Sequence, residues 1–257
     1  MMKNILSQAN REVIEQLAWS NALLAFDYDG TLAPIVEDPA GAFMRPTTRE
    51  LLAQAAKLYP TVVISGRSQD DALRRLRGVG VDEVVGNHGL EPWHGTGALI
   101  EKVRRWLSVL EPHLAHLKGV HVENKVFSLA VHYRQSREKK KARRVILRAA
   151  ATLGEVRVIG GKQVVNILPQ GAPHKGIALE RERARLRCDT AIYVGDDETD
   201  EDVFALDQPG RLLTVRVGAK RASAATYYIA RQADIDELLR ALIGLRRKLE
   251  DRRRAAR

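Results

Sequence analysis

Apolar residues recur along this chain with two periods, one typical of strands and one typical of helices, and the two alternate. The run Ala22–Phe26 is short, wholly apolar and followed by turn-forming residues, which is typical of a buried parallel strand. After it, Thr47 and Glu50 resemble a capping box that opens a helix. Further predicted strands are Thr61–Ile64, 81–85, 191–194 and Leu212–Val217. The alternation predicts an α/β fold with a parallel sheet.

The pattern changes between about Pro92 and Pro173. An amphipathic helix over 99–114 is followed by strict alternation of apolar residues from Phe127 to Tyr133, which predicts a sheet with one wet face. A basic helix and two short strands then complete an α-β-β-α-β-β segment; their predicted ranges are 136–152, 156–159 and 163–168.

The whole pattern predicts a doubly wound, Rossmann-like parallel-sheet core with an inserted smaller α/β cap domain. The core would comprise residues 1–91 and 174–257, and the cap residues 92–173. Two short hinges, near 91–94 and 169–173, would join them.

Composition narrows the class of protein. The net charge of +10 is concentrated in 137–148 and 246–257, and such runs are usually solvated helix faces. Without interleaved aromatic residues they do not predict nucleic-acid binding, although a basic field favours an anionic substrate. No run reaches the ~18 apolar residues of a membrane span, no signal peptide is evident, and the single cysteine, Cys188, cannot form an internal disulfide. We expect a cytoplasmic protein, monomeric or weakly oligomeric, with no membrane partner.

Two carboxylates, Asp27 and Asp29, follow the first buried strand directly and are followed by Gly30. Ligands bind at the carboxyl ends of strands in such sheets, so these residues are candidates for chemistry. An Asx turn with Gly30 at positive φ is the structural alternative. A calcium loop is disfavoured, because the glycine required at the sixth position is missing.

A second acidic cluster follows the predicted strand 191–194 and includes Asp196, Asp197 and Asp200. Packed carboxylates repel unless a cation neutralises them, and oxygen ligands from two loops suit Mg²⁺. Helix-dipole stabilisation explains the later acids better than Asp196 and Asp197. We therefore expect Asp27 to act as a nucleophile toward phosphorus and Asp29 as general acid and base.

Two further segments could hold a phosphoryl group. Ser65, Gly66 and Arg67 follow the strand Thr61–Ile64 and offer a hydroxyl and backbone amides, although Ser-Gly is common at such turns. Lys175 stands at a predicted helix start, where it opposes the dipole unless it has another role. It is a candidate phosphate clamp.

Together these motifs resemble the haloacid dehalogenase superfamily, with Asp27-x-Asp29-x-Thr31, Ser65, Lys175 and Gly195-Asp196-Asp197-x-x-Asp200 in order. Asp29 favours a phosphatase or phosphomutase over a dehalogenase. The resemblance implies that Asp27, the backbone carbonyl of Asp29 and Asp196 bind Mg²⁺. Asp197 or Asp200 would act through water or Lys175.

Longer signatures resemble the trehalose-6-phosphate phosphatase family: Phe26-Asp-Tyr-Asp-Gly-Thr-Leu32, Ile64-Ser-Gly-Arg67, Gly86-Asn-His-Gly-Leu-Glu91 and Gly195-Asp-Asp-x-Thr-Asp-Glu201. The resemblance implies that the cap grips the sugar hydroxyls through Glu123 and Lys125. The resemblance also extends to Gly161-Lys-x-Val and to Arg134 in the predicted cap. In the predicted core, it implies substrate contacts for Gly66, Arg67, Asn87 and His88. A turn histidine satisfied by the backbone is the alternative for His88.

The sequence departs from this family at one cap position. The usual Glu-Ile-Arg-Pro reads Asn166-Ile-Leu-Pro169, so one carboxylate and one guanidinium are missing. Asn166 can still accept a hydrogen bond from a hydroxyl, although a weaker one. The change affects the identity of the sugar rather than the chemistry.

The leading hypothesis is a Mg²⁺-dependent phosphatase that converts trehalose 6-phosphate to trehalose and phosphate through an aspartyl-phosphate intermediate. A phosphatase of another glycosyl or hexose phosphate is the alternative that Asn166 and Leu168 keep open, and a phosphomutase could use the same core. A basic module that binds polyanions is the alternative from a different class, and the paired acids Asp27 and Asp29 argue against it.

Overall fold

A computed structural model describes residues 2–92, 97–206 and 208–255 of the chain. Its larger sheet has the order β1-β11-β10-β9-β2-β3-β4, and all its strand pairs are parallel. The strands are β1 (Lys3–Asn4), β2 (Ala22–Phe26), β3 (Thr61–Ile64), β4 (Glu83–Val85), β9 (Thr190–Gly195), β10 (Leu212–Val217) and β11 (Tyr227–Ile229). The predicted parallel sheet is confirmed.

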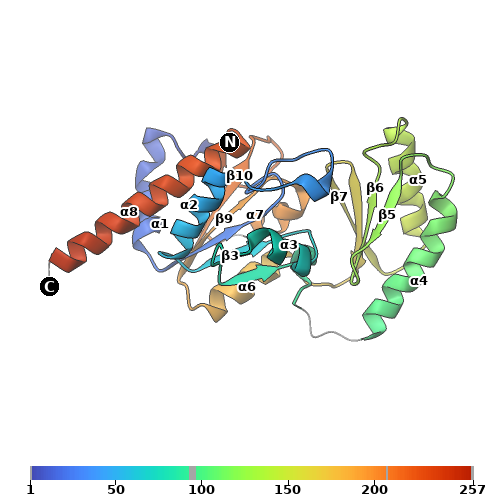
Figure 1. The fold of residues 1–257 in the computed structure, drawn as a ribbon, viewed down its shortest axis with the longest axis horizontal. Helices are drawn as coiled ribbons and strands as arrows, with labels where there is room; N and C mark the ends of the chain where they lie inside the picture. The colour runs from blue at the N-terminus through green and yellow to red at the C-terminus, as the bar shows by residue number, and fades with distance from the viewer. Residues whose placement is uncertain (1, 93–96, 207, 256–257) are drawn as a thin grey trace.

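Helices cover both faces of this sheet (Figure 1). Side chains of a strand alternate between faces, so Leu24 and Phe26 join one apolar cluster while Leu23 and Ala25 join another. On the first face lie α1 (Arg11–Trp19), α2 (Pro46–Ala56), α3 (Gln69–Leu76) and α8 (Ile235–Ala255). On the second lie α6 (Lys175–Arg185) and α7 (Glu201–Phe204). The core is therefore doubly wound, as predicted.

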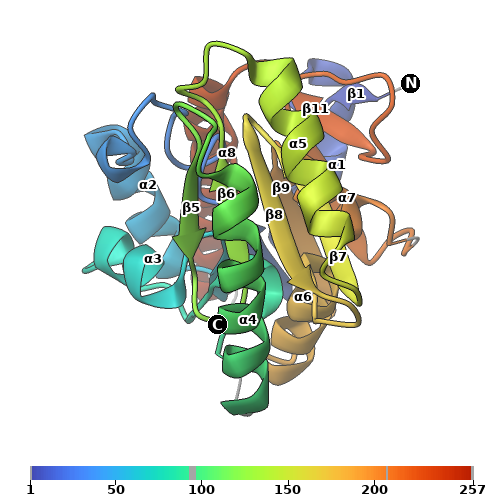
Figure 2. The same cartoon turned by 90° about the vertical axis from the view of Figure 1, so that its right-hand side faces the viewer.

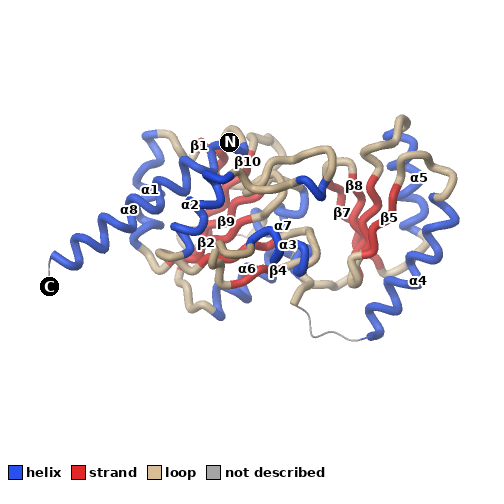
Figure 3. Tube along the Cα trace, in the orientation of Figure 1, coloured by secondary structure: helices blue, strands red, loops and turns tan. Residues whose placement is uncertain are grey.

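A smaller antiparallel sheet stands beside the larger one (Figures 1 and 3). Its order is β5-β6-β8-β7, with β5 (His121–Asn124), β6 (Leu129–His132), β7 (Val156–Gly161) and β8 (Val164–Pro169). Two helices, α4 (Gly97–Leu114) and α5 (Lys139–Ala151), pack on the face that points away from the larger sheet (Figure 2). These four strands and two helices, which we call the cap, lie between β4 and β9 in sequence.

The open face of the cap sheet is turned toward the core. Glu123, Ala130, Asn166 and Ile159 are aligned across its four strands by the pairing register, so their side chains share that face. The apolar cluster of the cap uses the alternate residues of these strands, such as Val131 and Val165. The cap is thus stabilised from one side and presents polar groups on the other.

Some predicted boundaries were wrong. Helix α2 begins at Pro46 after Arg45, with no side-chain cap, so Thr47 does not open a capping box. Alternation does not start at Phe127, because β6 begins at Leu129 after a turn in which Val126 has positive φ. The exact limits of the two domains stay a prediction, and part of the hinge predicted at 91–94 lies outside the described residues.

Five short 3₁₀ helices complete the described chain. They are η1 (Gln8–Asn10), η2 (Pro39–Gly41), η3 (Asn87–Gly89), η4 (Glu198–Asp200) and η5 (Gln232–Asp234). None of the helices within the described ranges combines the length and the apolar character needed to cross a membrane.

Candidate active site

The carboxyl ends of β2, β3 and β9 open into a cavity of about 720 Å³ between the core and the cap. The core contributes Asp27, Lys175 and Asp196 to its wall, and the cap contributes Glu123 and Asn166. The cavity therefore lies where a doubly wound sheet is expected to bind its ligand.

Asp27 and Lys175 form a buried ion pair at the bottom of this cavity. Strand β2 carries Asp27 to the sheet edge, where its amide donates to Val194. Lys175, at the start of α6, donates from Nζ to Asp27 Oδ1 and to Asp200 Oδ1, both at 2.7 Å. Burial raises the pKa of Asp27 well above its usual range, and Lys175 only partly opposes this because Asp200 and Asp196 add negative charge. The site carries excess negative charge.

Asp200 is fully engaged by hydrogen-bond donors. Besides Lys175, its Oδ1 accepts from the Tyr193 hydroxyl at 2.7 Å, and its Oδ2 accepts from the amides of Asp196 and Asp197 at 2.7 and 2.8 Å. Burial raises the pKa of Asp200, but Lys175 and these hydrogen bonds lower it more, so the net shift is downward. Asp200 thus stays ionised, and its carboxylate fixes the loop that carries Asp196.

Asp196 has one oxygen that is buried without a hydrogen-bond partner among the described residues, Oδ1. Its Oδ2 forms an ion pair with Lys162 of the cap. Burial raises the pKa of Asp196 to about 6, with Asp200 adding to the effect and Lys162 opposing it. A buried carboxylate oxygen with no donor is expected to meet a cation or a water.

The donor set fits a divalent cation with a preference for oxygen. Asp27, Asp196 and Asp200 each offer an oxygen, and the three atoms lie within 4.8 Å of one another. Since both oxygens of Asp200 are already occupied by donors, Asp27 and Asp196 are the carboxylates left to bind a metal. Gly30, at φ +89°, lets the Asp196 carboxylate pack against the turn, because a Cβ there would collide with it.

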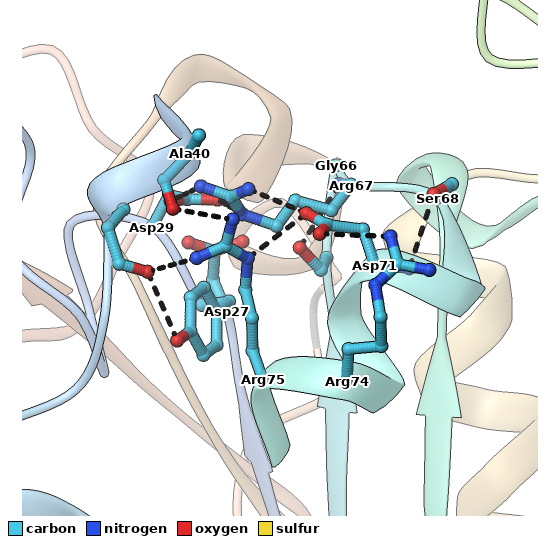
Figure 4. Close-up of polar contacts among 12 residues, drawn as sticks. Asp27, Asp29, Ala40, Gly66, Arg67, Ser68, Asp71, Arg74 and Arg75 are labelled. Carbon is cyan, nitrogen blue, oxygen red and sulfur yellow. Dashed lines mark hydrogen bonds and ion pairs between the residues drawn. The ribbon is translucent and has the colours of Figure 1, made fainter. Parts of the chain in front are cut away.

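Asp29 is paired with Arg67 in a bidentate contact (Figure 4). Arg67 Nε donates to Oδ2 at 2.6 Å and Nη2 donates to Oδ1 at 2.7 Å. Ser65, fully buried, accepts from the Arg67 amide at 3.1 Å. The segment Ser65–Arg67 thus orients the candidate general acid, a link that sequence reasoning missed because the two segments are 38 residues apart.

Lys125 of the cap contacts the core rather than pointing freely into the cavity. Its Nζ donates to the carbonyl of Gly66 at 2.7 Å, and its own carbonyl accepts from Asn87 Nδ2 at 2.9 Å. Asn87 also accepts from Ser128. It is fully buried and does not line the cavity, so its expected substrate contact stays a prediction.

His88 lies in the left-handed region (φ 60°) and lines the cavity with its ring buried. The Asn166 amide approaches the imidazole, but neither ring nitrogen has a hydrogen bond of standard geometry among the described residues. Burial, with Lys125 and Lys175 adding, lowers the pKa of His88 well below its usual range. A neutral imidazole with unused nitrogens can donate to or accept from a sugar hydroxyl.

The remaining predicted cap residues have distinct environments. The Glu123 carboxylate lies 2.9 Å from His132 Nε2 in a hydrogen-bonded pair, and this contact lowers the pKa of Glu123. Arg134 donates to the carbonyls of Val36 and Glu37 in the core. Leu168, by contrast, is buried in a small apolar cluster with Leu90 and does not line the cavity.

Sequence reasoning gave no role to several residues that the fold brings to the site. Lys162 follows a glycine in the β7–β8 turn, and Tyr193 lies on β9 under the acidic loop. Arg216, on β10, donates to the carbonyl of Asp196, to that of Asp197 at 3.3 Å and to Glu201 at 2.8 Å. A Gly-Lys pair was visible in the sequence; the other contacts depend on tertiary structure.

The turn that carries Asp27, the buried Lys175 and the acidic loop meet at one edge of a doubly wound sheet, which defines an enzyme of the haloacid dehalogenase type. Solved structures share this fold. The C-terminal domain of the Candida albicans trehalose-6-phosphate phosphatase matches with a TM-score of 0.78 at 22% identity, over 95% of this chain and 98% of that one. The Synechocystis sucrose-phosphatase matches with a TM-score of 0.56 at 18% identity, over 87% and 98%.

Sequence comparison is more specific. The profile of the trehalose-phosphatase family matches residues 25–231. The trehalose 6-phosphate phosphatase RA3 of Zea mays is 32% identical over 86% of this chain and 69% of its own length. The trehalose-phosphate phosphatase of Mycolicibacterium paratuberculosis is 32% identical over 91% and 66%. The chain belongs to the trehalose-phosphatase family and is a phosphoric monoester hydrolase.

Proposed function

We propose that the protein hydrolyses trehalose 6-phosphate to trehalose and phosphate, with Mg²⁺ and an aspartyl-phosphate intermediate on Asp27. The observation that carries this proposal is the buried contact of Asp27 with Lys175, beside an Asp196 oxygen that has no hydrogen-bond partner in the described part of the chain. A polar cap face lies across the cavity from these groups. The trehalose-phosphatase family membership supports the substrate class.

The metal would be held by Asp27, the backbone carbonyl of Asp29 and Asp196. When bound, it neutralises charge on the phosphoryl oxygens. Asp197 and Asp200 would support the site, the latter through its hydrogen bonds to the loop amides and Lys175.

In the first step, an Asp27 oxygen attacks phosphorus while the bond from phosphorus to the sugar oxygen breaks. Asp29 gives its proton to the departing oxygen. In the second step, Asp29 takes a proton from water, which attacks phosphorus and releases phosphate from Asp27. Lys175 and Ser65 stabilise the phosphoryl charge in both steps.

The open cap face would bind the sugar. Glu123 and Asn166 offer an anion and an amide toward the hydroxyls, and Lys125 offers the N–H groups that its bond to the Gly66 carbonyl leaves over. His88 and Arg134 line the same cavity. Cap closure over the cavity would exclude water from the first step. Gly66 and Arg67 would contact the phosphate side of the substrate.

The test is phosphate release from a panel of sugar phosphates, trehalose 6-phosphate included, by the enzyme with Mg²⁺ or with EDTA. We expect Mg²⁺-dependent turnover of trehalose 6-phosphate and its loss in Asp27→Asn, but not in Asp189→Asn, which changes an exposed aspartate. Mass spectrometry of acid-quenched enzyme should show added phosphate only when Asp27 is present. Full activity of Asp27→Asn would refute the mechanism.

A second candidate, a phosphatase of another glycosyl or hexose phosphate, is favoured by Asn166. This residue faces the cavity where the family usually has a carboxylate. Asn166→Glu should then change the ranking of substrates by kcat/KM, moving trehalose 6-phosphate upward by about tenfold, the value of one charge-assisted hydrogen bond. Val164→Thr, on the same face, serves as control. An unchanged ranking would exclude Asn166 as a specificity determinant.

A further inference from the structure

One carboxylate in the wall of the cavity, Asp71, has no role in the chemistry above. It is the third residue of α3, and its amide donates to Ser68 at 3.4 Å. Its carboxylate accepts from Arg67 Nη1 at 2.7 Å, from Arg75 Nε at 3.0 Å and from Arg74 Nη2 at 3.3 Å. One carboxylate therefore gathers three guanidinium groups.

Arg67 lies between Asp71 and the candidate general acid (Figure 4). Its Nε and Nη2 bind Asp29, and its remaining Nη1 binds Asp71. The guanidinium also lies over the ring of Tyr28, 5.6 Å from its centroid. Because the guanidinium is planar and rigid, fixing Nη1 fixes the direction of the two groups that hold Asp29.

Helix stabilisation alone does not account for this arrangement. An acid in the first turn favours the helix dipole, and ion pairs to Arg74 and Arg75 support a helix surface. Arg67, however, precedes α3, and its side chain is only 12% exposed, so its contact with Asp71 orders a residue of the cavity rather than the helix. Arg67 and Arg75 outweigh the effect of burial and lower the pKa of Asp71, which keeps its charge for this contact.

We propose that Asp71 is a positioning residue that holds Arg67 in the orientation required to aim Asp29 at the leaving oxygen. The inference rests on the proposed function. During the first step the proton moves from Asp29 to the oxygen that leaves phosphorus, and Arg67 stays protonated throughout. Asp71 touches neither the substrate nor the reacting atoms.

The test compares two esters that differ in their need for an acid. 4-Nitrophenolate leaves without much protonation, whereas phenolate is the poorer leaving group, and neither ester uses the sugar contacts of the cap. kcat/KM reports the steps through departure of the leaving group. In Asp71→Asn we expect the ratio of kcat/KM for 4-nitrophenyl phosphate to that for phenyl phosphate to rise about fivefold or more, a part of the ~10²–10⁴-fold that a general acid contributes.

Two variants bracket this result. Asp71→Glu, which keeps the charge, should restore part of the wild-type ratio. Arg74→Gln removes a contact to the same carboxylate on its exposed side, where Arg74 is 70% exposed, and should leave the ratio unchanged. If Asp71→Asn lowers kcat/KM for both esters by the same factor, the role of Asp71 is purely structural and the proposal is overturned. Unchanged kcat/KM for both esters would also overturn it.

Further measurements keep the test decisive. If Asp71→Asn does not fold, as judged by circular dichroism, Arg67→Lys breaks the same link with a single amine, and an unchanged ratio would overturn the proposal. If the wild-type enzyme accepts only sugar phosphates, the separate effects of Asp71→Asn on kcat and on KM provide the test. We expect kcat to fall about tenfold while KM stays within about twofold. A raised KM with a normal kcat would overturn the proposal. Wild-type enzyme inactive on every ester would instead refute the proposed function.

Discussion

Lys175 brings one positive charge into a pocket that contains the carboxylates of Asp27, Asp196 and Asp200, and its side chain is almost completely buried. Burial alone would lower the pKa of Lys175, but its contacts with Asp200 and Asp27 raise this pKa above its ordinary value. The lysine is therefore a structural counter-ion as well as a phosphate clamp in the proposed chemistry.

Lys175→Met should destabilise the metal-free protein by about 3–5 kcal/mol at pH 7, because it leaves buried carboxylates without their cation. The pKa of Asp27 is already raised in the folded protein, so protonation stabilises the folded form and this stability is lost as the pH rises. The deficit should therefore shrink between pH 7 and pH 5. Urea unfolding with EDTA measures it, with the exposed Lys220→Met as control. A deficit that does not change with pH would contradict the argument.

The site residues that could be predicted from the sequence are those that stand at the ends of predicted strands or helices. Asp27, Asp196 and Lys175 each stand next to a predicted strand or helix end, so topology alone brings them together. The contacts of Asp71 and Arg216 depend on side-chain directions after packing, which hydrophobic periodicity does not contain.

Helix α8 is tied to the core at the scale of elements by Tyr59, which follows α2. The Tyr59 hydroxyl donates to the carbonyl of Leu242 at 2.8 Å, and the Arg246 guanidinium lies over the ring, 4.2 Å from its centroid. Burial raises the pKa of Tyr59 to about 12, although Arg246 opposes this.

Tyr59→Phe should lower the free energy of unfolding by about 1 kcal/mol at pH 8 through loss of the hydrogen bond. A raised folded pKa means that wild-type stability from this group is complete below pH ~10 and is lost as the pH rises toward 12. The difference between wild type and variant should therefore diminish between pH 8 and pH 11. Urea titrations at both values test this. A difference in free energy of unfolding between wild type and Tyr59→Phe that is larger at pH 11 than at pH 8 would contradict a raised pKa of Tyr59.

Elements with a strong apolar run were predictable, whereas short or polar ones were not. Strands β2 and β3 match their predicted ranges because every residue in them is buried. Strand β1 has two residues, and β5 is largely exposed and carries His121, Glu123 and Asn124, so neither has a run that periodicity can detect. Their pairing comes from neighbouring strands.

The core and the cap are joined in the whole molecule by ion pairs as well as by the chain. Arg157 on β7 pairs with Asp202 on α7, and both side chains are partly buried. Lys162 and Arg134 make further contacts across the same boundary. These links hold the cap face over the cavity.

Arg157→Gln should raise KM for a sugar phosphate about threefold with little change in kcat, because one partly exposed ion pair contributes about 0.5–1 kcal/mol to holding the cap against the core. Asp202→Asn should have a similar effect, and the double variant should add nothing more. Steady-state kinetics of the four proteins give the coupling. Additive effects would show that the two residues act separately.

The two-sided cap sheet has a consequence for divergence within the family. Residues that hold the cap together, such as Val131 and Val165, and residues that face the cavity, such as Asn166, alternate along the same strands. Exchange of a cavity-facing residue does not remove a contact of the packed side, so if this face binds the sugar as proposed, single substitutions on it can change sugar preference. Proteins of this fold can therefore diverge in substrate preference while the packing of the cap domain is kept.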